Sequence, residues 1–86
     1  MNVLVERENG EYIGSIEGFW IVENAKTSEE VVFKLASSLN EFAIDYCNDL
    51  ELYKTTPNFN FMYPKIERIL KSDINSIVNT FEIKVK

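Results

Sequence analysis

Residues 27–53 read TSEEVVFKLASSLNEFAIDYCNDLELY, and this stretch decides the fold. It contains no proline or glycine, and its large apolar side chains recur every three or four residues, the spacing of one helix face. Thr27 or Ser28 can cap the start, and the two acidic residues that follow favour the positive end of a helix dipole. We therefore predict one helix over residues 28–53, roughly 39 Å long. Its apolar stripe consists of Val31, Leu35, Leu39, Phe42, Tyr46, Leu50 and Tyr53.

Upstream of this helix the pattern has a period of two, which predicts strands. Asn9-Gly10 separates the first two runs, and this pair is a strong hairpin signal because a type I′ turn needs positive φ at both central residues. Gly18 separates the second run from the third. Gly14 lies inside the second run and predicts a bulge or a close approach by another backbone or ring. The predicted strands, residues 2–8, 11–17 and 19–25, form a three-stranded antiparallel meander.

Downstream, the composition of Thr55–Asn58 predicts a loop. Pro64 suits the first turn of a second, shorter helix, and a third helix should begin near residues 72–73. Residues 81–86 alternate again and predict a short final strand. The long helix exceeds what three strands can cover, so part of its stripe should pack on something else. The expected fold is α+β, a single domain over residues 1–86, with the meander packed on one long helix plus two short helices.

Two further features have packing interpretations. Phe59, Phe61, Met62 and Tyr63 follow the predicted loop, and we favour a plug that closes the end of the core over a recognition patch. Cys47 lies one step off the apolar stripe, with no basic neighbour in the sequence to activate its thiol. It is expected to be a half-buried packing residue rather than a reactive one.

The composition excludes several kinds of chemistry. The 86 residues carry 14 acidic and 9 basic side chains, a formal charge of −5, and no histidine. Histidine-based triads, imidazole metal ligands and a base poised near neutral pH are therefore absent. One cysteine allows neither an internal disulfide nor a four-cysteine zinc site. Glu6 and Glu8 would share a strand face and leave a magnesium-dependent enzyme as a weak alternative, but we predict no enzyme, no metal and no cofactor.

The distribution of apolar and charged residues also bears on localisation and partners. The longest apolar run, Phe19–Val22, is far shorter than the roughly 18 residues of a membrane span, and we expect a cytoplasmic protein. Residues 1–30 hold seven acids and two bases, a net of −5, whereas residues 54–86 hold six bases and three acids, a net of +3. The net negative charge of residues 1–30 argues against nucleic-acid binding by this part of the chain. It suits a basic protein partner, although ordinary domains also carry acidic faces.

The element order and two blocks of residues resemble known antitoxins of bacterial toxin–antitoxin systems. The first block is similar to a strand, glycine turn, strand and Thr-x-Glu-Glu helix start of the HicB-like group. The second is similar to the end of the long helix in a related set associated with RelE/RelB modules. The first block comprises Glu8–Tyr12, Gly18, Ile21–Glu23 and Thr27–Val31, and the second comprises Asp45–Asp49, Tyr53, Pro57-Asn58, Tyr63-Pro64 and Ile69-Leu70.

This resemblance implies a degenerate, partial RNase H-like fold without nuclease activity. It implies a protein that neutralises a small toxin, commonly an RNase, encoded by a neighbouring gene. Many HicB-like antitoxins carry a separate DNA-binding domain, for which these residues leave no room, so operator binding is not expected. The alternative is a stand-alone homo-oligomeric domain with a structural or regulatory role and no toxin.

Two expectations concern surfaces. We expect a homodimer, because nothing near residues 1–8 blunts the first strand as an edge and the long helix overhangs the sheet. The toxin should contact an acidic surface with an apolar centre on and beside the third strand. The candidate contact residues are Glu17, Phe19, Trp20, Glu23, Glu29 and Glu30.

Overall fold

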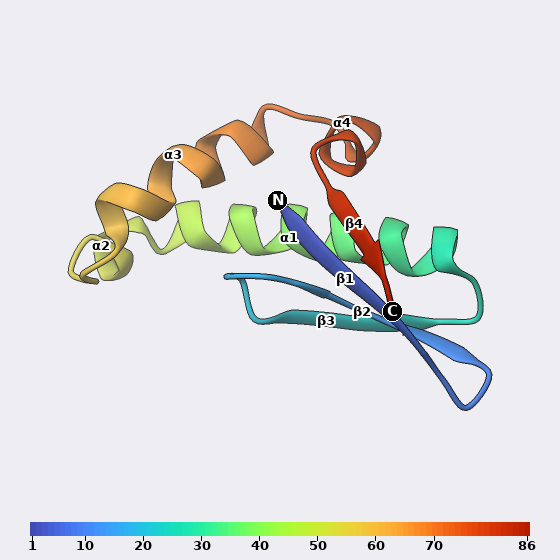
Figure 1. Cartoon of the computed structure of the whole chain (residues 1–86). Helices are drawn as coiled ribbons and strands as arrows, with labels where there is room; N and C mark the ends of the chain where they lie inside the picture. The colour runs from blue at the N-terminus through green and yellow to red at the C-terminus, as the bar shows by residue number, and fades with distance from the viewer.

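The long helix α1 lies between a sheet and a pair of helices (Figure 1). The computed structural model describes all 86 residues. Helix α1 contacts β2 and β3 on one side and α3 and α4 on the other. The elements in chain order are β1 (Asn2–Glu8), β2 (Glu11–Ile16), β3 (Ile21–Ala25), α1 (Ser28–Asn48), α2 (Leu50–Tyr53), α3 (Phe59–Leu70), α4 (Ile74–Asn79) and β4 (Glu82–Val85).

The sheet has four strands in the order β3-β2-β1-β4 and is mixed. Strands β1, β2 and β3 pair antiparallel in sequence order, as predicted, but β4 adds a parallel neighbour to β1. Val3 lies opposite Ile83 and Val5 opposite Val85 in this parallel ladder. The predicted final strand is therefore confirmed, but its pairing was not expected: the sheet is mixed and has four strands rather than being a three-stranded meander, because the alternating tail covers the outer edge of β1.

The turns explain the strand boundaries. Asn9 and Gly10 have φ of 51° and 80°, and the predicted hairpin is confirmed, with Glu8 opposite Glu11. The β2–β3 turn contains two left-handed residues, Gly18 at φ 89° and Trp20 at φ 55°. Strand β3 consequently begins at residue 21 rather than at 19.

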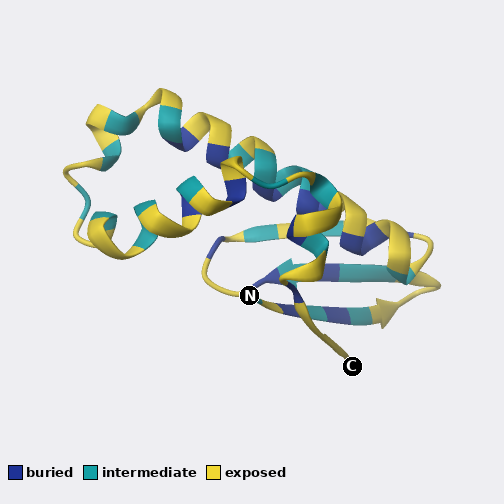
Figure 2. Cartoon of the chain, turned by 90° about the horizontal axis from the view of Figure 1, so that it is seen from above, coloured by how far each residue is buried: buried dark blue, intermediate teal, exposed yellow.

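Helix α1 begins where the sequence predicts and ends earlier. The Thr27 side chain accepts a hydrogen bond from the Glu30 N–H at 3.1 Å, which is the expected N-cap. Asp49 leaves helical geometry, with φ −110° and ψ 33°, so the prediction of one helix to residue 53 was wrong at its end. Asn48 and Asp49 bond readily to nearby backbone in non-helical conformations, which favours a break at this point. The overhanging part of α1 packs on α3, as the length argument required (Figure 2).

The two later helices differ in how well they were predicted. Helix α3 starts at Phe59, so Pro64 lies inside it rather than in its first turn. Pro64 removes one backbone hydrogen bond, to the carbonyl of Asn60, a residue that is exposed. Helix α4 starts as predicted, with the Asp73 carboxylate accepting a hydrogen bond from the Ser76 N–H at 2.7 Å.

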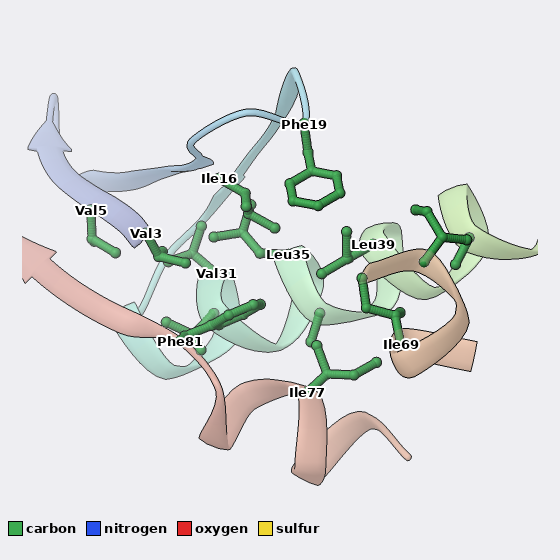
Figure 3. Packing of buried hydrophobic residues seen from close by; sticks show 14 of the residues in the cluster. Val3, Val5, Ile16, Phe19, Val31, Leu35, Leu39, Ile69, Ile77 and Phe81 are labelled. Carbon is green, nitrogen blue, oxygen red and sulfur yellow. The ribbon is translucent and has the colours of Figure 1, made fainter. Parts of the chain in front are cut away.

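One core joins all the layers (Figure 3). Gly14 shows why a glycine is needed in β2: a Cβ there would lie 2.7 Å from Cδ1 of Leu35. A close approach at Gly14 was expected, but aliphatic side chains of α1 make it rather than a backbone or a ring, and the β1–β2 register runs through Gly14 without a bulge. The most deeply buried side chains include Val3, Val5, Val31, Leu35, Leu39, Ile66 and Ile77.

Strand β4 also removes one reason for expecting a homodimer. Strand β1 was expected to be an unprotected edge, but it is an inner strand between β2 and β4. The overhang of α1 is covered within the chain by α3. The homodimer stays a prediction. The unpaired edge on this side of the sheet is β4 rather than β1. None of the helices has the length and apolarity needed to cross a membrane.

Candidate partner-binding surface

The β2–β3 turn holds two adjacent aromatic residues in opposite environments. Trp20 is 98% exposed, while Phe19 is only 6% exposed. The Phe19 ring packs edge-on against Phe42, with centroids 6.0 Å apart, and Figure 3 shows it pointing from the turn toward α1. The turn is further tied to the sheet by the Glu17 N–H, which donates to the carbonyl of Asn2 at 3.0 Å. The buried ring thus anchors a turn that presents Trp20 to solvent.

The backbone of Trp20 is unfavourable for its side chain. A φ of 55° places it in the left-handed region, which costs a residue with a Cβ roughly 1–2 kcal/mol. Bulky residues are rare there, and such outliers concentrate at functional sites. Neither burial nor backbone preference accounts for a tryptophan at this position.

An apolar groove of about 410 Å³ runs beside Trp20. One wall is the β2–β3 turn, and the other is formed by the C-terminal part of α1 together with α2 and the start of α3. Tyr46 and Tyr53 stack in it with ring centroids 4.2 Å apart. In a continuous helix these residues would be roughly 10 Å apart along the axis, so the break at Asp49 brings them together. The lining residues are Gly18, Phe19, Trp20, Ile21, Phe42, Tyr46, Tyr53, Thr56, Asn58 and Met62.

Tyr46 contributes a buried polar atom to this groove. Its hydroxyl is buried without a hydrogen-bond partner. Burial, with smaller contributions from Tyr53 and Cys47, raises the pKa of the Tyr46 phenol above its ordinary value near 10, and the nearby Thr56 side chain opposes part of this rise. The folded chain holds this proton more tightly than the unfolded chain. The resulting stability is therefore complete below pH of about 10 and is lost as the pH rises through the raised pKa.

Acidic side chains lie near the turn and the groove. Glu17 is exposed in the turn itself and accepts a hydrogen bond from the Asn2 side chain at 3.2 Å. Asp45 is exposed and follows Phe42 by three residues within α1, the spacing that places side chains together on a helix. Asp49 is exposed at the C-cap of the same helix. The arrangement is an apolar groove with negative charge beside it.

The structure distributes the six candidate contact residues over three places. Glu17, Phe19 and Trp20 share the turn, and Phe19 belongs to the core. Glu23, in the middle of β3, is half-buried and accepts a hydrogen bond from the Ser38 hydroxyl at 2.8 Å. The exposed pair in the first turn of α1, Glu29 and Glu30, lies beyond the far end of β3, a strand about 16 Å long.

The remaining candidates are structural. Phe59 and Tyr63 stack at 5.2 Å and pack against the core, as the plug interpretation predicts. The plug prediction was wrong for Phe61, which is 68% exposed, with the Lys65 ammonium 4.1 Å from its ring centroid. Cys47 is half-buried against the core, as expected. No three acidic or cysteine side chains come close enough together to hold a metal ion.

Sequence reasoning missed a second apolar groove, of about 380 Å³, between β4, α1 and α4. Ile83 and Val85 of β4 and Phe33 of α1 line it and are exposed. The alternation of the tail was visible in the sequence. Its pairing with β1, which creates this groove, was not.

Two comparisons with known proteins agree. Residues 1–83 match the PHD-like family, described as antitoxins of RelE/RelB toxin–antitoxin systems. The fold is similar to a crystal structure from Syntrophomonas wolfei subsp. wolfei, described as an antitoxin part of a proposed toxin/antitoxin system, with a TM-score of 0.89 and 34% identity. That match covers 99% of this chain and 62% of the other, so the chain spans less than two thirds of its neighbour's length. No curated protein matches the chain. The family match agrees with the RelE/RelB resemblance seen in the sequence, and the structural match agrees with the resemblance to antitoxins. Neither names a HicB-like protein.

Proposed function

Because the chain belongs to the PHD-like family of antitoxins of RelE/RelB toxin–antitoxin systems, we propose that it neutralises a small RNase toxin by direct protein–protein contact. The observation that carries the proposal is Trp20, whose ring is almost fully exposed on a turn with unfavourable backbone geometry. Exposed tryptophans of this kind are typical binding hot spots. The toxin would cover Trp20 and fill the apolar groove beside it.

Charge supports a basic partner. The chain carries a formal charge of −5, and the exposed carboxylates of Asp45 and Asp49 come three residues after Phe42 and Tyr46, which line the groove. An RNase needs positive charge to hold RNA phosphates, so an acidic surface would attract it and speed association. In this proposal Glu23, Glu29 and Glu30 extend the negative potential along β3, and the encounter takes place in the cytoplasm, where the RNA is.

Finer features of the family resemblance belong to the same proposal. We infer that β1, β2, β3 and α1 form the part shared with HicB-like antitoxins and their partial RNase H-like fold. We also propose that the chain forms a homodimer. Catalysis and operator binding are not part of the proposed role.

Co-expression with the neighbouring toxin-sized gene tests this function. We expect the chain to restore growth and to co-elute with the gene product, and Trp20→Ala to weaken both effects. Phe61→Ala is the matched control, because Phe61 is also an exposed ring but does not line the groove. A stand-alone domain would show neither rescue nor co-elution. Equal losses in both variants would contradict a contact at Trp20.

A further inference from the structure

The backbone of β4 is arranged to accept another strand. The Glu82 N–H donates to the Met1 carbonyl at 2.7 Å, and the Lys86 N–H donates to the Val5 carbonyl at 2.8 Å. Even-numbered residues of β4 therefore face β1 with their peptide groups, and the N–H and C=O of Ile83 face away from the sheet. Strand β4 is the last in the sheet order and runs free at the margin of the molecule (Figure 2).

The opposite edge of the sheet is protected. The Lys34 ammonium donates to the Asn24 carbonyl of β3 at 3.0 Å, which occupies an acceptor on that edge. The left-handed backbone of Trp20, directly before Ile21, also prevents β3 from extending further toward its N-terminal end. Lysines and short, bent strands are the usual means of blocking edge pairing. Strand β4 is also short and carries Lys84, but no hydrogen bond occupies the outward-facing N–H and C=O of Ile83.

The side chains of β4 divide by face. Ile83 and Val85 point to the same face as Val3 and Val5, toward the groove that Phe33 also lines. Exposed apolar side chains beside an open strand edge favour association. The other face of β4 carries Glu82 and Lys84, which alternate in charge.

This alternation is complementary to a second copy of itself. If two β4 strands pair antiparallel with Ile83 opposite Ile83 at the twofold axis, Glu82 of each copy lies opposite Lys84 of the other. The two Ile83 residues then exchange both of their free backbone hydrogen bonds. Opposite charges directly across a ladder are stabilising, and like charges are destabilising. Shifting the register by one step to place Lys84 on the axis would oppose Lys84 to Lys84.

We propose that the β4 edge is the homodimer interface, joining two sheets into one continuous eight-stranded sheet through antiparallel β4 pairing centred on Ile83. This inference deepens the homodimer of the preceding subsection and is independent of toxin binding. The occupant is a second copy because Glu82 and Lys84 complement each other under a twofold axis, which also makes the interface isologous.

Charge exchange tests the register. Light scattering on the purified chain should give twice the 10.0 kDa chain mass. Lys84→Glu and Glu82→Lys should each weaken the dimer at least tenfold, because each opposes like charges twice. The double exchange, Glu82→Lys with Lys84→Glu, should restore it. Lys86→Glu is the control: its charge change equals that of Lys84→Glu, but Lys86 has no opposite partner in this register.

A backbone variant tests the edge itself. Ile83→Pro removes the N–H at the axis, and this group makes no bond to β1, so the monomer should keep its melting temperature and its circular dichroism spectrum. It should no longer dimerise. A wild-type chain that stays at 10.0 kDa would overturn both the homodimer and this interface. A dimer that survives Ile83→Pro would overturn the interface alone, and neither result would alter toxin neutralisation.

Discussion

Replacing Trp20 by glycine should stabilise the fold while weakening the proposed toxin contact. The ring is 98% exposed, so its removal forfeits almost no burial. Glycine relieves the left-handed backbone, which costs a residue with a Cβ roughly 1–2 kcal/mol. Glycine also gives the unfolded chain more conformational entropy, which lowers the free energy of unfolding by about 0.4–1 kcal/mol. The net gain is about 0–1.6 kcal/mol, with a central value near 0.8 kcal/mol that corresponds to about 3–6 °C in melting temperature for a domain of this size.

Trp20→Ala separates the two effects. Alanine removes the same ring but keeps the Cβ and the unfavourable φ, so its free energy of unfolding should lie within about 0.5 kcal/mol of wild type. Both variants should lose about 2 kcal/mol or more of toxin binding, a roughly 30-fold rise in Kd. Thermal unfolding by circular dichroism and titration calorimetry with the toxin measure the two quantities. A Trp20→Gly variant that melts below wild type would refute the reasoning, because the ring would then be supporting the fold.

Three further variants test the packing. Gly14→Ala places a Cβ 2.7 Å from Cδ1 of Leu35 and should cost about 1–3 kcal/mol in urea unfolding, with a smaller cost in a Leu35→Ala background. Thr27→Ala removes the cap on the Glu30 N–H and should cost about 1 kcal/mol, whereas Thr27→Ser should be nearly neutral. Tyr46→Phe removes an unpaired buried hydroxyl and should gain about 1 kcal/mol at neutral pH. Because this variant cannot ionise, its melting temperature should also fall less than that of wild type above pH of about 10.

Local features of the fold could be predicted from the sequence because their causes are local. The Asn9-Gly10 turn, the Thr27 cap and the start of α4 each depend on side chains within a few residues. The requirement for glycine at position 14 was also visible, although Leu35 as its neighbour was not. The end of α1 was missed because the apolar stripe continues past Asp49 and conceals the break.

Features that depend on distant pairing could not be predicted in the same way. Glu82 lies opposite Asn2 in the sheet, although the whole chain separates them, and no periodicity indicates which strand a tail will join. The candidate contact surface was predicted as one patch because its residues are close in sequence. The turn geometry instead buries Phe19 and exposes Trp20, and β3 separates Trp20 from Glu29 and Glu30.

Titration of the purified chain into the purified product of the neighbouring gene, with RNA cleavage as the readout, tests the proposed neutralisation most directly. The account predicts that cleavage falls to background at about one antitoxin chain per toxin. It also predicts that Trp20→Ala needs a large excess to reach the same inhibition while Phe61→Ala behaves as wild type. Cleavage that continues undiminished in excess wild-type chain would contradict neutralisation by direct contact.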